Sequence, residues 1–583
     1  MTLSPASEHG PSLLMIEGSA TAIAVALAFA WPQIGSRYFS GIERLFKQLA
    51  RRKGLSVAIV GAAAFLLRLA ILPLCPAPYP FIPNDFSFLL AADTFASGRL
   101  TNPTPAMWVH FETIHIAMKP TYMSMYFPGQ GLALALGKVL TGHPWFGVLC
   151  TSALMCAALC WMLQAWLPPG WALLGGIIAI LRLGLFCYWI NTYSGGGSLA
   201  ALGGALVLGA LPRLMRGGAR FRYGMLMAIG IILLATSRPY EGLLLCLPVA
   251  FVLARWIFSG KNRPPATVLF RMAALPLLLV IAAGIWMGYY DYRAFGHTLT
   301  PPYKVDRTAY AMAPYFVWQS ARPEPLYRHQ VLRNFYSRDE LRDFEKIHSA
   351  SGFVPQTLVK ALRGILFFAG IALLPPLLMF RRVLMDHRTR FFVICTLVLM
   401  AGMAIEVFLV PHYLAPFTAV FYVLGLQAMR HLRLWKPGDQ PVGMALVRLC
   451  VVLCFLLAGL RLYAQPLHME PAEWPVSEWT GYWYGPGHFG GARAGIEARL
   501  EQLPGKQLVI VRYSPGHNPV DEWVYNAPDI DHSRVIWARG MGPANNLELI
   551  DYYKDRTVWL VQPDTKPVEV TPYSLPKSTQ PGS

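Results

Sequence analysis

Hydrophobic residues gather in long runs along this 583-residue chain, separated by shorter polar segments. A run of roughly 18 to 25 apolar residues is long enough for a helix to cross the hydrocarbon core of a bilayer. About twelve runs of that length can be recognised, at about 13–31, 55–74, 144–166, 170–190, 196–214, 223–238, 240–258, 268–290, 358–380, 391–410, 412–430 and 444–463. The pattern predicts an all-α polytopic membrane protein with about twelve transmembrane helices.

Composition supports a membrane protein and argues against a nucleic-acid-binding one. Hydrophobic residues make up 55% of the chain and charged residues 14%, whereas about a quarter of the residues in a soluble domain are charged. The net charge of +19 is carried largely by short loops between apolar runs. Basic residues in such loops set the orientation of a membrane protein, so we expect a lipid bilayer as partner and no nucleic acid.

The basic residues occupy every second loop, and this alternation predicts the orientation. They cluster at 37–53, 213–222, 255–271, 381–390 and 430–448. Loops rich in Lys and Arg stay in the cytoplasm, so both termini are expected outside, together with segments 75–143, 291–357 and everything after 464. We therefore divide the chain into an N-terminal span with its basic cytoplasmic loop (1–54), a membrane domain (55–463) and an external C-terminal domain (464–583).

The C-terminal segment has the pattern of a small soluble α/β domain. Short runs rich in β-branched and aromatic residues at 508–514, 535–538 and 558–561 are typical of buried strands, and 546–555 between the last two is typical of a helix. The Pro/Ser/Thr-rich tail from 562 to 583 is expected to be irregular. The aromatic run at 474–484 is either a lid over the membrane domain or a linker along its surface.

The first external segment holds the densest polar chemistry of the chain. It begins with Asn84-Asp85-Phe86-Ser87-Phe88 directly after an apolar run that is expected to point outward. The motif and its position resemble the GT-C class of membrane glycosyltransferases, the group that includes protein mannosyltransferases and lipid A aminoarabinose transferases. The resemblance extends more weakly to about residue 463. It implies transfer of a sugar from a polyprenyl-phosphate donor to an acceptor hydroxyl on the outer face, where the acceptor is a glycan, a lipid or a protein.

The chain departs from this class at the first motif position. The resemblance implies an acidic base there, but Asn84 is an amide and cannot accept the proton of a hydroxyl. We therefore predict that the carboxylate of Asp85 takes that role; the alternative is that Asp85 caps the helix that follows it. Asp93 lies about two helical turns further on and is a second candidate, for binding an acceptor hydroxyl or a metal.

Two further groups of residues in the outer part of the chain could bind substrate or metal. His110, Glu112 and His115 offer three metal ligands, with a polar cavity lining as the alternative, so a divalent cation is a possible cofactor. The second group supplies cations for the donor phosphate. Its main member is the segment Arg238-Pro-Tyr-Glu241 at an expected outer turn, where burying the Arg and Glu charges is costly unless they are functional or paired. The candidates for donor and substrate binding are Arg238, Glu241, Lys119, His412 and Tyr122.

Two other functions remain open on the sequence alone. A transporter or flippase of lipid-linked sugars would carry charged or broken helices at the midplane of the membrane. Few ionisable residues lie inside the apolar runs of this chain. Arg68 and Arg182 are expected to extend toward the interface, and Glu406 to point at the outer cavity. A non-catalytic protein of cell-envelope assembly is the third hypothesis, and Asn84 is the residue that keeps it open.

Overall fold

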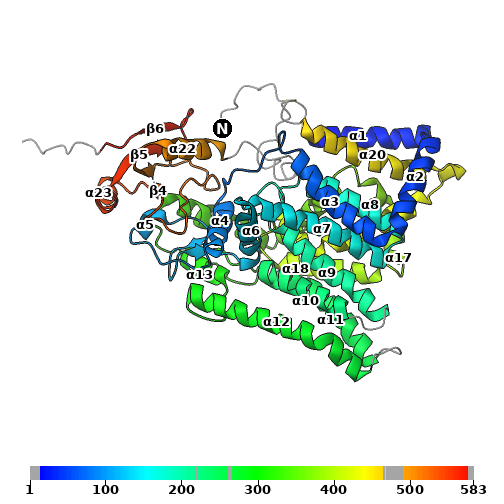
Figure 1. The fold of residues 1–583 in the computed structure, drawn as a ribbon. Coiled ribbons are helices and arrows are strands. Elements are labelled where there is room, and N and C mark those ends of the chain that lie inside the picture. The colour runs from blue at the N-terminus through cyan, green and yellow to red at the C-terminus, as the bar shows by residue number, and fades with distance from the viewer. Residues whose placement is uncertain (1–12, 217–220, 260–264, 464–466, 468–489, 575–583) are drawn as a thin grey trace, which may run out of the picture.

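The computed structural model describes residues 13–216, 221–259, 265–463, 467 and 490–574. A bundle of helices occupies most of the molecule, and a small sheet lies at one end of it (Figure 1). The aromatic run at 474–484 lies outside the described residues, as do both chain ends, so the predictions made for them stay predictions.

Seven helices of the described chain are long and apolar enough to cross a membrane. They are α1 (Leu13–Ala30), α3 (Lys53–Ala70), α7 (Trp145–Trp166), α9 (Gly197–Arg216), α11 (Pro239–Ser259), α12 (Ala266–Phe295) and α20 (Val442–Leu462). A bent pair, Pro375–Met385 and Arg390–Ile405, turns by 108° between its halves, and two shorter apolar helices span Pro169–Gly184 and Phe221–Ser237. The predicted count of about twelve spans is therefore not confirmed.

The remaining predicted runs form helices that are either shorter than a span, such as α10 (Phe221–Ser237), or interrupted. α16 (Phe353–Ala369) ends at Gly370, whose φ of 59° takes the backbone out of the helix. Prolines follow at 375 and 376 and lack the N–H that a continuing helix needs. The other helices of the bundle are α2 (Ser36–Arg51), α8 (Pro169–Ala179), η1 (Ile180–Gly184), α10 (Phe221–Ser237), η3 (Pro375–Met379), α17 (Phe380–Met385), α18 (Arg390–Ile405), η4 (Pro411–Phe417), α19 (Thr418–Arg433) and η5 (Pro437–Asp439).

Small residues allow the central helices to pack closely. A Cβ added at Gly203 of α9 would lie 2.9 Å from the carbonyl oxygen of Gly230 in α10, and the reciprocal contact is 2.7 Å. Backbones approach this closely where small residues face each other. In contrast, only 11% of the apolar window of α12 is buried inside the structure, so this helix faces the lipid.

Two buried arginines do not extend toward the interface as predicted. Arg68 is fully buried and donates to the carbonyl oxygen of Cys75 at 2.9 Å and to Oδ1 of Asn191 at 3.0 Å. Arg182 lies 3.7 Å from Glu17 and donates to the carbonyl of Phe368. Terminal nitrogens of Arg68 and Nε of Arg182 donate to nearby oxygens within the protein, so these groups are held inside the bundle.

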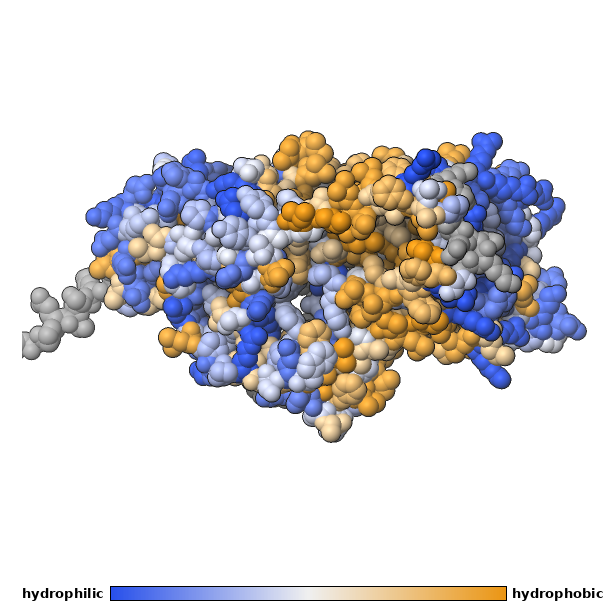
Figure 2. Space-filling view, turned by 90° about the horizontal axis from the view of Figure 1, so that it is seen from below, coloured by the Kyte–Doolittle hydropathy of each residue, from blue (hydrophilic) through white to orange (hydrophobic). Residues whose placement is uncertain are grey.

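The two segments expected outside the membrane, 75–143 and 291–357, which we call the first and second outer segments, fold into short elements over one end of the bundle. They are α4 (Pro83–Ala96), α5 (Trp108–Phe111), β1 (Ile116–Ala117), β2 (Met123–Ser124), α6 (Pro128–Thr141), α13 (Pro302–Tyr310), α14 (Gln330–Arg333), η2 (Asn334–Glu340) and α15 (Leu341–His348). Figure 2 shows hydrophilic residues at both ends of the molecule and hydrophobic residues gathered between them. This distribution is the one expected of a protein that crosses a bilayer.

The C-terminal segment forms the predicted small α/β structure. Its elements are α22 (Gly491–Gln502), β3 (Lys506–Val511), β4 (Val535–Arg539), α23 (Pro543–Tyr552), β5 (Arg556–Gln562) and β6 (Glu569–Pro572). The sheet order is β4-β3-β5-β6, with β3 parallel to both neighbours and β6 antiparallel. The expectation of an irregular tail after residue 562 is wrong over β6, because those residues complete the edge of the sheet.

Candidate active site

Asp85 lies in the first turn of α4 and is 1% exposed. Its Oδ1 accepts backbone hydrogen bonds from Tyr193 at 3.1 Å and Ser194 at 2.8 Å, while Oδ2 is buried without a hydrogen-bond partner among the described residues. Burial raises the pKa of Asp85 to about 6, and the hydrogen bonds from Ser194 and Tyr193 oppose that rise. The carboxyl group is thus anchored through one oxygen and has the other free to take a proton.

The alternative role for Asp85, as the cap of its own helix, stays a prediction. α4 begins after Ile82 without any side-chain cap hydrogen bond, and Asp85 instead bonds the segment that precedes α9. Asp93 does not join Asp85 either. It pairs with Lys138 of α6 at 2.7 Å and fixes α4 against α6, so the two carboxylates of α4 serve different contacts.

Asn84 faces His115 rather than Asp85. Its Oδ1 accepts a hydrogen bond from Nδ1 of His115 at 2.9 Å, and that nitrogen also lies 3.1 Å from the hydroxyl of Tyr126. One turn along α4, the hydroxyl of Ser87 donates to the carbonyl oxygen of His115 at 2.7 Å. Two side chains of α4, at i and i+3, therefore hold His115 in place.

The backbone and the charge state of His115 are both unusual. Its φ of 66° lies in the left-handed region that few non-glycine residues adopt. Burial, together with the nearby charge of Arg307, lowers the pKa of His115 to about 3. The imidazole is therefore neutral at physiological pH and serves Asn84 as a hydrogen-bond donor.

The three predicted metal ligands do not come together. His110 bonds the carbonyl oxygen of Arg539, and Glu112 accepts from Tyr310 at 2.8 Å, whereas His115 faces Asn84. Within the described part of the chain, no group of three His, Cys, Asp or Glu side chains is arranged to hold a metal ion. The side chains of this segment instead fix it to neighbouring elements.

Arg238 lies at the centre of a second buried group. Its Nη1 is 4.0 Å from Oε1 of Glu241, and its guanidinium carbon lies 4.2 Å from the centre of the Tyr413 ring. Tyr303 and Tyr126 are also within electrostatic reach of Arg238. Tyr126 contacts His115 as well, so this aromatic ring connects the group around Arg238 to Asn84.

Neighbouring residues add two more charges to this group. Glu406 interacts electrostatically with Arg238, Glu241 and Lys360, and Nζ of Lys360 donates to the carbonyl oxygens of Met403 and Glu406. We call these five residues, Arg238, Glu241, Lys360, Glu406 and Tyr413, the Arg238 cluster. Nearby, His412 pairs with Tyr188 through Nδ1 at 2.8 Å, so it is held within the protein on that side.

An apolar cavity of about 360 Å³ lies beside the Arg238 cluster. Residues of several elements line it, among them Gly364 and Phe368 of α16, Met403 of α18, Leu414 of η4 and Phe421 of α19. Lys360 is the one charged residue among the described residues that line it. The cavity therefore combines an apolar body with a cation at the edge that it shares with the Arg238 cluster.

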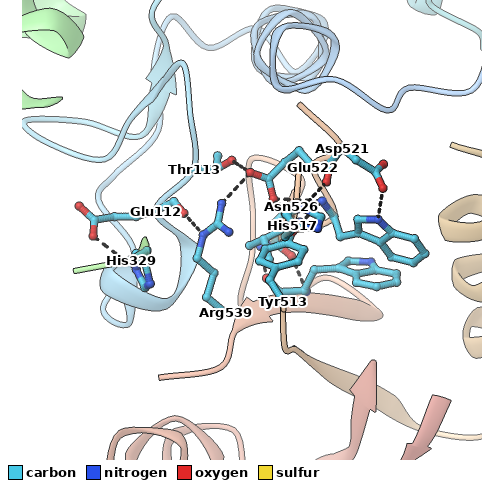
Figure 3. Close-up of polar contacts among 12 residues, drawn as sticks. Glu112, Thr113, His329, Tyr513, His517, Asp521, Glu522, Asn526 and Arg539 are labelled. Carbon is cyan, nitrogen blue, oxygen red and sulfur yellow. Dashed lines mark hydrogen bonds and ion pairs between the residues drawn. The ribbon is translucent and has the colours of Figure 1, made fainter. Parts of the chain in front are cut away.

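A buried ion pair within the C-terminal domain also bonds the first outer segment (Figure 3). Nη2 of Arg539, at the end of β4, donates to Oε2 of Glu522 at 2.6 Å, and the two side chains are 3% and 1% exposed. Arg539 also donates from Nε to the carbonyl oxygen of Glu112, and the hydroxyl of Thr113 donates to Glu522. Ligands of parallel sheets commonly bind at this edge, and here the chain's own segment at 112–113 is bound beside it.

The same C-terminal region also contacts α4 and the strand pair. The backbone N–H of Glu522 donates to the carbonyl oxygen of Phe81 at 3.0 Å, and Tyr525 stacks on Phe86 with centroids 4.7 Å apart. The hydroxyl of Tyr122 donates to the carbonyl of Asn526 at 2.8 Å. Tyr122 thus holds the C-terminal domain, and the segments on either side of Asn84 are both anchored by residues 522–526.

Lys119, the other predicted phosphate ligand, is exposed and lies over the ring of Trp108 at 4.2 Å. Lys360 and the Glu522–Arg539 pair were not predicted from the sequence. A lone Lys inside an apolar run is a signal that could have indicated Lys360. The Glu522–Arg539 pair has no such signal, because its partners are distant in sequence.

No family model matches the chain, and no curated protein matches its sequence. The chain is similar in structure to ArnT from Cupriavidus metallidurans bound to undecaprenyl phosphate, with 13% identity over 87% of this chain and 92% of that one and a TM-score of 0.46. It is also similar to the Archaeoglobus fulgidus oligosaccharyltransferase tethered with an acceptor peptide, with 10% identity, 80% of this chain covered and a TM-score of 0.42. The match spans 62% of that archaeal protein. These structural neighbours are GT-C glycosyltransferases, the class that the sequence resembles.

Proposed function

We propose that this integral membrane protein is a glycosyltransferase that transfers a sugar from a polyprenyl-phosphate donor to an acceptor hydroxyl on the outer face. The observation that carries the proposal is the apolar cavity beside the Arg238 cluster, with Lys360 at its edge. An isoprenoid chain needs an apolar surface, and its phosphate needs cations close to that surface. Arg238 and Lys360 supply these cations.

In the proposed reaction, the acceptor hydroxyl attacks the anomeric carbon of the donor, and the bond from that carbon to the phosphate oxygen breaks. The phosphate stays on the lipid, and the hydroxyl proton passes to a base. We assign that role to Oδ2 of Asp85, the carboxylate oxygen without a partner among the described residues. A pKa of about 6 suits a general base at neutral pH, because the group is ionised and still basic enough to take a proton.

Asn84 is assigned a different role from the base. With His115 donating to its Oδ1, the amide retains an N–H₂ group that can donate to a substrate oxygen. His115 is the positioning residue for that amide. Among the described residues, no group of three His, Cys, Asp or Glu side chains could hold a metal ion. The proposed reaction therefore includes no step that uses a divalent cation.

The proposal is tested by transfer from radiolabelled polyprenyl-phosphate sugars in membranes that contain the full chain. We expect the native chain to transfer label, and Asp85→Asn to lower the rate by about 10² to 10⁴. Asp555→Asn, which changes a surface acid of the C-terminal domain, is the matched control and is expected to transfer label at the native rate. Full activity of Asp85→Asn would exclude Asp85 as the base, and absence of transfer from every carrier would overturn the enzymatic proposal.

Asn84→Asp is the informative second variant. If the amide acts only as a donor, an acid at this position is expected to lower transfer. A large gain would instead show that the native chain is impaired at this position and that the carboxylate belongs at residue 84.

A second candidate, a transporter of lipid-linked sugars, is favoured by a separate observation. The pair Pro375–Met385 and Arg390–Ile405 is bent by 108°, and broken helices are characteristic of transport sites. In the same membranes, this function predicts that labelled donor crosses the bilayer without any transfer of label to an acceptor. The two measurements therefore distinguish the candidates.

A further inference from the structure

α2 (Ser36–Arg51) is a helix with three chemically different faces. One face packs on the protein: Glu43 pairs with Arg433 at 2.7 Å and with Arg448 at 3.0 Å, and Phe46 packs against the main core. Ala50 continues this face and is 1% exposed. The contacts fix the rotation of the helix about its own axis, and so they decide which residues point away from the protein.

The second face is apolar and exposed. Tyr38, Ile42 and Leu45 recur at i, i+4 and i+7, which places them in one stripe. They are 80%, 63% and 68% exposed. Such a continuous exposed apolar stripe indicates contact with an apolar partner.

The third face is basic. Arg37, Arg44, Lys47 and Arg51 are all exposed, and they lie on the side of α2 away from both the packed face and the apolar stripe. The only acid of the helix is Glu43, and it is already paired within the protein. The outward charge of α2 is therefore entirely positive, and the two residues that follow, Arg52 and Lys53, extend it.

The position of α2 determines which partner this combination fits. The helix lies across one end of the bundle between α1 and α3, at the end opposite the C-terminal sheet (Figure 1). The axis of α2 thus runs across the axes of these two spans (Figure 1). The helix lies at the edge of the hydrophobic region between the two hydrophilic ends of the molecule (Figure 2). In this place an apolar stripe meets acyl chains and a basic face meets lipid phosphates.

We propose that α2 is an in-plane helix that binds the headgroups of anionic phospholipids at the membrane surface. Its apolar stripe enters the acyl boundary, and its basic face attracts the phosphates. A nucleic acid or an acidic protein segment could satisfy the charge, but neither would bury Tyr38, Ile42 and Leu45. The proposal is independent of the glycosyltransferase proposal.

The test is hydrogen exchange of the backbone amides of residues 36–51 in the full chain reconstituted into nanodiscs. We compare nanodiscs of neutral phosphatidylcholine with nanodiscs that also contain phosphatidylglycerol. Exchange is expected to be slower with phosphatidylglycerol, and high salt should remove the difference because it screens exposed charges. Each positive charge removed is expected to reduce the lipid-dependent protection about fivefold.

Two charge-matched variants make the test specific. The triple variant Arg37→Gln, Arg44→Gln and Lys47→Gln should lose the difference between the two nanodiscs. The variant Arg338→Gln, Arg342→Gln and Lys346→Gln removes three exposed charges from the outer helical segment of η2 and α15 and should retain it. A difference that survives in the first variant, or is absent from the native chain, would overturn the proposal.

A separate variant tests the apolar stripe. Ile42→Asp leaves the packed and basic faces unchanged and should speed exchange of α2 in both kinds of nanodisc. Unchanged exchange in this variant would overturn insertion of the stripe. Protection of the native helix by inorganic phosphate or an oligonucleotide in neutral nanodiscs, to the extent seen with phosphatidylglycerol, would overturn the lipid assignment in favour of a different anion.

Discussion

Glu522 and Arg539 form a buried ion pair, with 2.6 Å between Oε2 and Nη2, that fixes the C-terminal sheet to the segment leading to His115. Thr113 donates to the same carboxylate, and the carbonyl of Glu112 accepts from the same guanidinium. The pair contacts residues 112 and 113, and His115 in the same segment contacts Asn84. The pair is therefore connected to the candidate active site through this segment. It explains why a domain so far along the chain bears on the geometry of the first outer segment.

Removing Arg539 should therefore destabilise the C-terminal domain strongly. Arg539→Met leaves Glu522 buried without its cation, and losing one partner of a buried pair costs about 3 to 5 kcal/mol. The expected result is a lower unfolding temperature and faster proteolysis of residues 490–574. The double variant Arg539→Met with Glu522→Gln should recover part of the loss, and equal loss in both would contradict the pairing.

The pair also predicts a pH dependence. Burial raises the pKa of Glu522, but the charge of Arg539 and the hydrogen bonds outweigh it and hold that pKa below its ordinary value. The folded protein therefore binds this proton more weakly than the unfolded chain, and stability is lost as the pH falls through the pKa of the folded state. Unfolding temperatures measured at successively lower pH values in the acidic range should fall in the native chain. They should fall less in Glu522→Gln.

Asp85 should show the opposite dependence. Burial raises its pKa from 3.8 to about 6, so the folded protein binds the proton more tightly than the unfolded chain does. The free energy of unfolding should fall as the pH rises from about 4 to about 6, by a total on the order of 3 kcal/mol. Thermal unfolding of Asp85→Asn in detergent should lack this slope, whereas Asp339→Asn, which changes a partly exposed acid, should keep it. An unchanged slope in Asp85→Asn would contradict the assignment.

Lys360 should contribute to binding of the donor phosphate. Lys360→Met removes a charged donor, and a hydrogen bond to a charged group contributes about 1.5 to 3 kcal/mol. Binding of undecaprenyl phosphate to the purified chain should weaken about tenfold to 100-fold. Lys346→Met, which removes an exposed lysine from α15, is the control and should bind as the native chain does. Equal affinity of the Lys360 variant would place the phosphate elsewhere.

Filling the apolar cavity should block the lipid without disturbing the fold. Gly425 lines the cavity, and a Cβ added there meets no atom within 4 Å. We expect Gly425→Leu to fold and to weaken binding of undecaprenyl phosphate about tenfold, equivalent to about 1.4 kcal/mol. Gly459→Leu adds the same side chain at an equally open position of α20 outside the cavity lining. If both variants bind lipid alike, the cavity is not the lipid site.

The apolar runs by themselves determine much of the fold. Hydrophobic length alone predicts helices that cross a bilayer, because every backbone polar group must be satisfied within the segment. Three of the four strands of the C-terminal sheet follow in the same way from short β-branched runs at 508–514, 535–538 and 558–561. The number of spans does not follow, because Gly370 and the prolines at 375 and 376 break a run whose composition is still apolar.

The candidate site is only partly determined by sequence. The motif at 84–85 and its place after a span can be recognised in the sequence, since they are local. That Asp85 bonds the backbone of residues 193 and 194, that Asn84 meets His115, and that Lys360 lies at the edge of an apolar cavity were decided by the tertiary structure. The contacts of residues 84 and 85 join positions separated by 31 to 109 residues, and no local pattern specifies which distant polar groups will meet when the helices pack.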